Sequence, residues 1–443
     1  MRKFYAKKKL YLLIPIIFAS FWIFLSLFKD NFYLFNAVDF DGFYIASRKI
    51  YLNPGAVYVI ETPGNQHYYL PSFATLLGMF TVFTSYEVSM VIFFVILYLI
   101  TILLIFEFDK LLIISKMDNK ITRLFLLIVI FNSYSFFINF DYMQCKLIPI
   151  YLLVLFLRRE IQYRRDSEKY SENKFLFVQM MIFVFALGTL PQYIIFFSII
   201  YLFHGISWKG IFKKSQLKKY GLFILALLVQ NFMLFIIIID NPETISFLLS
   251  RTTTRSAIIF HGSRTPSELV ELKANFPEVI FFFVLHFIDE FINLSFLNGN
   301  ILALFSIGIM LITSILLAFQ RTMRIEIKMA YFSLIVICFS LYYRILEIII
   351  FIPLVALLFV DRLNSFNNPF DFLRKNFVWI IGLLSIQLIN IVPKEYYFYI
   401  ILPILYDFPV FVIFFPLLIF YTLFLSSIYT LRIHPILKKI IFK

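Results

Sequence analysis

Two carboxylates one residue apart, Asp39 and Asp41, open the polar stretch "DFDGFYIASRKIYLNPGAVY" in a chain otherwise dominated by Ile, Leu and Phe. An acid of this kind can act as a general base toward a hydroxyl within hydrogen-bonding distance. It can equally cap a helix or stand in a solvated loop. Phe40, Tyr44 and Ser47 follow at helical spacing, so the stretch predicts a short helix with Asp39 near its start.

The composition decides the class of protein that must position these acids. Of 443 residues, 61% are hydrophobic and 15% are charged, whereas about a quarter of a soluble domain is charged. The chain also contains apolar runs of about 20 residues, the length that crosses a bilayer. We therefore expect an all-α polytopic membrane protein. Its first apolar run, residues 10–28, lacks the short core and cleavage site of a signal peptide and is expected to be retained.

The breaks between the apolar runs predict about 12 transmembrane helices. They are expected near residues 10–28, 88–106, 121–138, 147–158, 175–190, 192–205, 221–239, 300–319, 329–343, 345–360, 376–392 and 409–430. Two further segments, 70–84 and 279–297, are expected to lie on the outer face rather than cross. The first is opened by Pro71 and is read as an interfacial or re-entrant helix, and the second as an amphipathic interfacial helix.

The charges predict an orientation for this bundle. With the N-terminus in the cytoplasm, the cytoplasmic pieces hold 30 of the 40 Lys and Arg but only 10 of the 26 acids. That bias gives a plasma-membrane protein with both termini cytoplasmic. It explains the net charge of +14 by topology and attraction to membrane lipids, without nucleic acid. Residues 1–443 form one membrane domain, with long outer loops at 29–87 and 240–300.

The stretch around Asp39 resembles the start of a known family, the polyprenol-phosphate-mannose-dependent α-mannosyltransferases of the GT-C class. The family pattern is an Asp-Phe, a Tyr-rich helix ending in Ala, a Gly-to-Tyr turn and a Tyr-Pro-Pro before an apolar run. The matching residues here are Asp39, Phe40, Tyr44, Ala46, Gly55, Tyr58, Tyr69 and Pro71, with one proline missing. The resemblance is specific over residues 39–80 and otherwise rests on architecture.

Later motifs of that family are only partly present. "YMQCK" supplies Gln144, but Met143 and Lys146 stand where the family has Gly and Asn. The segment before Pro191 lacks the family's Lys. "NGN", with Asn298 and Asn300, partly matches an Asn-Gln-Ser element. Where the family often has His, "SLYYRILE" has Arg344 and Glu347.

The resemblance implies a GT-C-like bundle with an outer-face site. Asp39 is the expected general base and Asp41 the second choice, because partial desolvation at a membrane boundary raises the pKa of a carboxylate. A lipid-phosphate donor needs a cationic clamp, and Lys146 and Arg344, assisted by Gln144, are the candidates. Arg344 can instead pair with Glu347. Loop arginines are the alternatives: Arg251, Arg255 and Arg264.

Further substrate-binding candidates line the predicted outer loops and helix ends. They are Tyr44, Arg48, His67, Tyr69, His261, Asn300 and Glu347. A lone His is more often structural than catalytic. No cluster of His, Asp or Glu has the spacing of metal ligands, so neither a metal nor a cofactor is expected.

The expected activity is inverting transfer of a hexose, expected to be mannose, from a polyprenyl-phosphate donor to a lipid-linked or glycan acceptor at the outer face. The alternative from another class is a transporter or flippase of lipid-linked glycans, which favours broken helices, internal repeats and charges at mid-membrane. A polysaccharide polymerase or ligase and a structural membrane subunit are weaker alternatives. A purely structural membrane subunit would leave the paired acids Asp39 and Asp41 unexplained.

Overall fold

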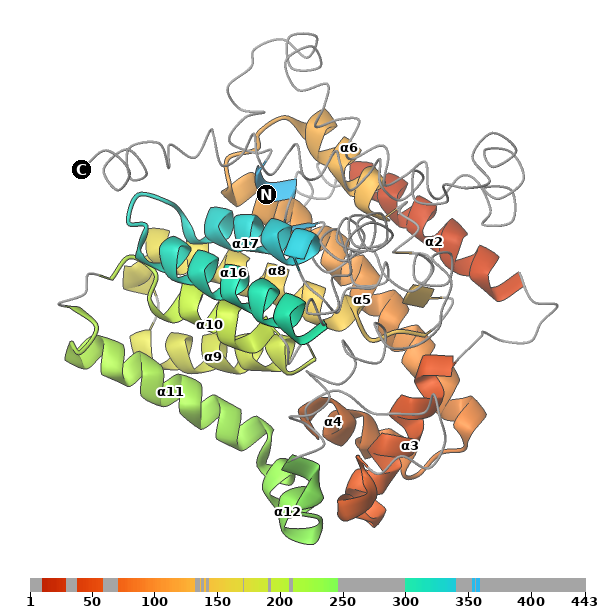
Figure 1. Ribbon diagram of the computed structural model, residues 1–443. Coiled ribbons are helices and arrows are strands. Elements are labelled where there is room, and N and C mark those ends of the chain that lie inside the picture. The colour runs from red at the N-terminus through yellow and green to blue at the C-terminus, as the bar shows by residue number, and fades with distance from the viewer. Residues whose placement is uncertain are drawn as a thin grey trace, which may run out of the picture.

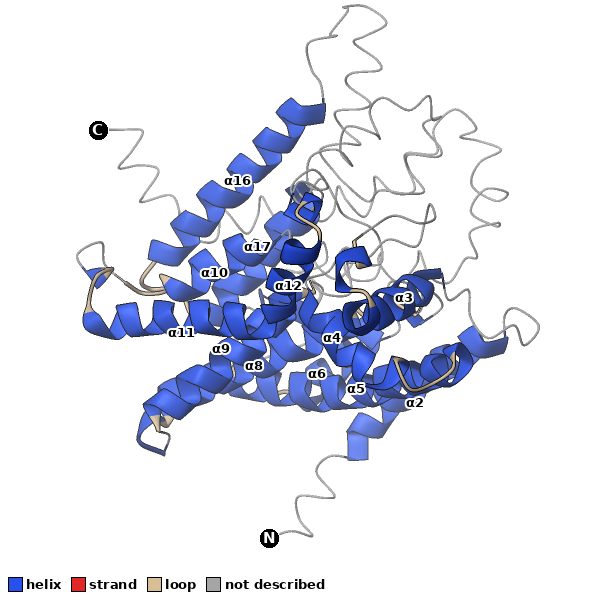
Figure 2. Cartoon of the chain, turned by 90° about the horizontal axis from the view of Figure 1, so that it is seen from below, coloured by secondary structure: helices blue, strands red, loops and turns tan. Residues whose placement is uncertain are grey.

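A computed structural model of the 443-residue chain describes most of residues 10–245 and parts of residues 299–358 (Figure 1). The described residues are 10–28, 38–58, 71–131, 136, 139–140, 143–169, 171–189, 193–206, 210–245, 299–339, 353–354 and 356–358. Within these ranges every regular element is a helix and none is a strand (Figure 2). The all-α class is therefore confirmed for the described part of the chain.

The helices follow the apolar runs of the sequence. In chain order they are η1 (Leu10–Leu12), α2 (Leu13–Phe28), α3 (Val38–Leu52), η2 (Pro54–Ala56), α4 (Pro71–Thr81), α5 (Tyr86–Ile114), α6 (Lys120–Phe131), α8 (Leu147–Arg165), η3 (Ser167–Lys169), α9 (Glu172–Gly188), α10 (Ile194–Leu202), α11 (Lys214–Gln230), α12 (Phe232–Asp240), α16 (Gly299–Phe319) and α17 (Ile325–Phe339).

A bundle forms around the long helix α5. Its main partner is α8, and α9, α11, α10, α16 and α17 follow as successive neighbours. Aromatic rings pack in the interior: the Phe156 centroid lies 4.7 Å from that of Phe183, which it stacks on, and 4.7 Å from that of Tyr201, which it meets edge to face. At one end of the bundle α3, η2 and α4 pack together and against α12, which places two segments far apart in the sequence side by side (Figure 1).

The predicted ends of two helices were wrong. Helix α5 continues to Ile114, beyond the predicted 88–106, and α8 continues to Arg165, beyond the predicted 147–158. Both extensions carry acids that had been assigned to loops. Glu107 and Glu160 are buried there in ion pairs with Arg158 and Arg164, so the helices continue where isolated charges would have ended them.

The segment predicted as one helix at 221–239 is two helices. α11 and α12 meet at Asn231 with a bend of 53°, and the Asn231 side chain donates to the Leu227 carbonyl at 3.0 Å. Among the described residues, α5 alone is long and apolar enough to cross a bilayer. If α11 and α12 together form one bent span, the described residues contain two such spans. The number of about 12 crossings is therefore not confirmed. Predicted helices 376–392 and 409–430, most of 345–360, and segment 279–297 lie outside the described residues.

The prediction of a helix opened by Pro71 is confirmed by α4. Proline suits this first position because it needs no hydrogen-bonded N–H there. The helix has 11 residues, which span about 16 Å at 1.5 Å per residue, about half of a hydrocarbon core. Helix α4 is therefore too short to cross a bilayer.

Candidate functional site

Helix α3, which carries the paired acids, is held against α4 by a close backbone approach. A Cβ on Gly78 would lie 2.5 Å from the Ser47 carbonyl oxygen and 2.4 Å from Cε2 of Tyr51, so a larger residue does not fit. Beside this contact the Ser47 and Thr81 hydroxyls are hydrogen-bonded at 2.8 Å and buried. Glycine at position 78 thus sets how closely α3 approaches its neighbour.

Asp41 faces the start of α5. Its Oδ1 accepts a hydrogen bond from the Tyr86 hydroxyl, and the adjacent Phe40 ring lies 5.5 Å from the Tyr86 ring and 5.4 Å from the Phe93 ring. The second-choice base is therefore fixed to α5 by a charge-assisted contact. Asp39 is the second residue of α3, as predicted from the sequence, and its side chain lies outside the described residues.

Tyr44 and Arg48, both predicted to bind substrate, lie together one turn apart on α3. Arg48 Nη1 donates to the Tyr44 hydroxyl at 2.8 Å and to the Thr81 carbonyl at 3.3 Å. The Tyr44 hydroxyl approaches the Thr84 carbonyl at 3.4 Å. Both side chains are half-buried and tie α3 to the turn between α4 and α5, so they shape the corner in which Asp41 stands.

The two predicted outer loops meet at this corner. Asn241, just after α12, donates from Nδ2 to the Gly55 carbonyl at 3.1 Å, across 186 positions of sequence. Tyr58, four residues after Pro54, is buried beside α12. The described residues 53–58 of the first loop and 240–245 of the second therefore lie together at one end of the bundle.

Gln144 and Lys146, predicted to bind the donor phosphate, lie deeper in the bundle. Lys146 is the residue before α8, and both side chains are buried, at 4% and 6% exposure. Arg165 at the far end of α8 donates to the Ile114 carbonyl at 2.5 Å, an offset of 51 residues.

The ion pair between Arg158 and Glu107 has the same offset of 51 residues. This register puts Lys146 level with Val95, about 13 Å along α5 from Tyr86 at 1.5 Å per residue. The rings of Phe40 and Phe43 pack on Phe93, which lies between Tyr86 and Val95 on α5.

The remaining predicted site residues are not placed. Asn300 is the second residue of α16, and its side chain lies outside the described residues. The others that lie outside them are His67, Tyr69, His261, Arg344 and Glu347, together with the alternative clamp residues Arg251, Arg255 and Arg264. The structure thus groups Asp41, Tyr44 and Arg48 on α3 near the start of α5. Gln144 and Lys146 lie together at the start of α8, further along α5.

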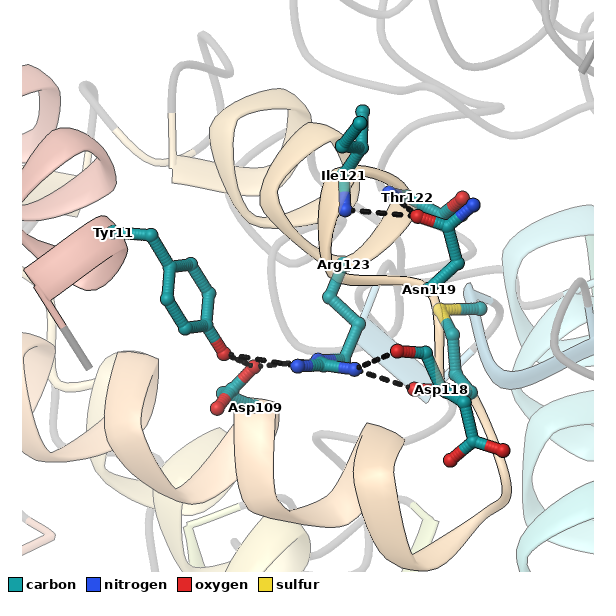
Figure 3. Close-up of polar contacts among 8 residues, drawn as sticks. Tyr11, Asp109, Asp118, Asn119, Ile121, Thr122 and Arg123 are labelled. Carbon is teal, nitrogen blue, oxygen red and sulfur yellow. Dashed lines mark hydrogen bonds and ion pairs between the residues drawn. The ribbon is translucent and has the colours of Figure 1, made fainter. Parts of the chain in front are cut away.

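Sequence reasoning missed a buried ionic network at the opposite end of the bundle (Figure 3). Arg123 on α6 pairs with Asp109 on α5, Nε to Oδ1 at 3.0 Å, and donates to the Met117 and Asp118 carbonyls at 2.7 and 2.9 Å. The Tyr11 hydroxyl donates to the same carboxylate at 2.5 Å. The network joins the first described helix to α5 and α6.

A second polar group at that end connects three helices. The Arg164 guanidinium donates twice to Glu160 Oε1, at 3.0 and 2.9 Å. Tyr201 on α10 donates to the other oxygen of that carboxylate at 3.3 Å, and Lys219 on α11 donates to the Tyr201 carbonyl at 2.8 Å. The sequence signal for this group is the i, i+4 spacing of Glu160 and Arg164.

Comparison of the chain with protein-family models, with curated proteins and with solved structures gives no match.

Proposed function

We propose that the protein is an inverting, polyprenyl-phosphate-dependent hexosyltransferase whose site lies at the α3 corner. The observation that supports this best is the packing of α3, with Asp39 in its first turn, where both predicted outer loops meet at one end of an apolar bundle. The proposal includes a plasma-membrane location with this end outward and a GT-C-like bundle of about 12 crossings. The carrier-bound sugar, an acceptor hydroxyl and membrane lipids are the proposed partners.

The proposed chemistry uses both groups of residues, those on α3 and those at the start of α8. The Asp39 carboxylate removes the proton from an acceptor hydroxyl, and the freed oxygen attacks the anomeric carbon. The bond from that carbon to the phosphate oxygen breaks, and its electron pair leaves with polyprenyl phosphate, so the configuration inverts. Lys146 and Gln144, at the start of α8, stabilise charge that develops on the leaving phosphate.

The activity is tested with purified full-length protein and a panel of polyprenyl-phosphate sugars, following release of polyprenyl phosphate in the presence of glycolipid acceptors. Release with at least one sugar, dependent on the acceptor, is expected. Absence of release across hexose, pentose and amino-sugar donors would contradict the proposal.

The proposed clamp makes a separate prediction. Lys146→Ala removes a cation that we assign to the donor phosphate, so the KM for the donor is expected to rise about tenfold or more, as for loss of a charge-assisted hydrogen bond. The control is Lys214→Ala, which removes an exposed lysine from α11. A donor KM unchanged by Lys146→Ala in a folded protein would exclude Lys146 from the clamp.

One observation favours the alternative of a flippase. The 53° break between α11 and α12 is the kind of discontinuity that transporters use near their binding sites. The discriminating experiment reconstitutes the protein in liposomes with a labelled polyprenyl-phosphate hexose. A flippase moves the intact lipid between leaflets without an acceptor, whereas the transferase consumes it only when an acceptor is present.

A further inference from the structure

Three cations and a histidine gather around the Glu160 group, at the end of the bundle opposite α3. They come from four parts of the chain: Arg164 lies in the last turn of α8, His204 in the turn after α10, Lys219 on α11 and Lys328 on α17. The side chain of Lys328 is completely buried, and its ammonium donates to the Ala318 carbonyl at 2.9 Å. We call these four residues with Glu160 the basic cluster.

The basic cluster carries more positive than negative charge. Glu160 is the acidic member of the cluster, and its carboxylate is already occupied by Arg164 and Tyr201. Lys219 and Lys328 donate to backbone carbonyls, which supply hydrogen bonds but no countercharge. With Arg164 balanced by Glu160, these contacts give Lys219 and Lys328 no carboxylate of their own, and burying a charge without compensation is costly.

His204 supplies an independent sign of a missing partner. Its Nδ1 is buried and has no hydrogen-bond partner among the described residues. The His204 backbone N–H donates at 3.4 Å to the same Tyr201 carbonyl that accepts from Lys219. With its proton on Nδ1, the imidazole presents an unused donor beside the cations of the cluster, a set suited to an oxyanion.

We propose that the basic cluster binds a dianionic phosphate monoester group. The ammonium groups of Lys219 and Lys328 match the charge of such a group, and Lys219, Lys328 and His204 supply donors from three elements. The Arg164 side chain, 43% exposed, is the most exposed member of the cluster. The proposal is independent of the transferase proposed above, because the cluster lies at the other end of the bundle and shares no residue with the α3 corner.

The test measures thermal unfolding of the full-length protein in nanodiscs of phosphatidylcholine alone, with added phosphatidic acid, or with added phosphatidylglycerol. Phosphatidic acid carries a phosphate monoester and phosphatidylglycerol a singly charged diester. A parallel series adds inorganic phosphate, with sulfate at equal ionic strength as its control. The variants are Lys219→Gln and Lys328→Gln, which retain a donor at each position, and the matched control is Lys214→Gln on the exposed side of α11.

Stabilisation by phosphatidic acid but not by phosphatidylglycerol supports a phosphate monoester lipid headgroup. Stabilisation by inorganic phosphate as well shows that the free group suffices. In either case we expect Lys219→Gln or Lys328→Gln to raise about tenfold the concentration of phosphatidic acid or phosphate needed for half-maximal stabilisation, as for loss of a charge-assisted hydrogen bond. Lys214→Gln should leave that concentration unchanged. No selective stabilisation, or equal loss in the Lys214 control, would overturn the proposal.

Discussion

The buried pair of Asp109 and Arg123, at the end opposite α3, is satisfied by its neighbours. The Asp109 carboxylate, with a side chain 2% exposed, accepts from both Arg123 and Tyr11. Arg123 Nη1 donates to carbonyls of the turn between α5 and α6, and its Nη2 donates to the Tyr11 hydroxyl at 3.3 Å. A pair satisfied in this way is stable as a unit, but removal of one member leaves the other charge buried and unpaired.

Arg123→Gln should therefore destabilise the protein strongly, by about 3–5 kcal/mol, as found when one partner of a buried ion pair is removed. The measurement is reversible unfolding in detergent, followed by helical circular dichroism. Lys110→Gln is the matched control, since Lys110 pairs with Glu107 from a half-exposed position and should change stability by less than about 1 kcal/mol. Equal losses in the two variants would show that the Asp109 network is not a special anchor.

At the scale of helices, the contact between α3 and α4 depends on one residue without a side chain. Gly78→Ala places a methyl group against the Ser47 carbonyl, which is backbone and cannot rotate away. We expect a loss of about 1–3 kcal/mol, typical of overpacking, together with a fall in turnover if α3 carries the base.

Gly221→Ala on α11 is the control for that substitution. Nothing lies within 4 Å of a Cβ there, so alanine should be neutral or stabilise the helix by up to about 1 kcal/mol. Both variants are compared by thermal unfolding in the same detergent. If Gly78→Ala unfolds no earlier than Gly221→Ala, the close approach of α3 and α4 does not limit stability.

Apolar periodicity predicted where helices occur, including α3 and the start of α4 at Pro71, but not where α5 and α8 end. Their acids are buried because partners arrive from other helices, as Arg158 does at Glu107. No spacing in the local sequence reveals a partner 51 residues away. The bend at Asn231 was missed because one Asn in an apolar run does not break the hydropathy pattern.

In the candidate site, too, local contacts were predictable from the sequence and contacts between helices were not. Tyr44 and Arg48 are four residues apart, so their contact is readable from helical spacing. The hydrogen bond from Tyr86 to Asp41 depends on how α3 docks on α5, which no local pattern encodes. Lys146 was identified as a cation at a helix start, but its depth relative to α3 follows only from the register of α5 and α8.

At the scale of the whole molecule, the described helices form a bundle with two unlike ends. One end gathers α3, α4 and α12 with the paired acids, while the other buries the Asp109 network and the basic cluster. In our account, sugar transfer belongs to the α3 end and phosphate binding by the basic cluster to the other.

The most direct test of the central claim is acceptor-dependent release of polyprenyl phosphate by the purified wild-type, Asp39→Asn and Asp41→Asn proteins. A general base contributes about a hundredfold or more to the rate, so Asp39→Asn should lose at least that much turnover while its thermal unfolding stays unchanged. Asp41→Asn weakens the contact with Tyr86 and should unfold earlier yet retain turnover. Turnover by Asp39→Asn near the wild-type rate would contradict the account.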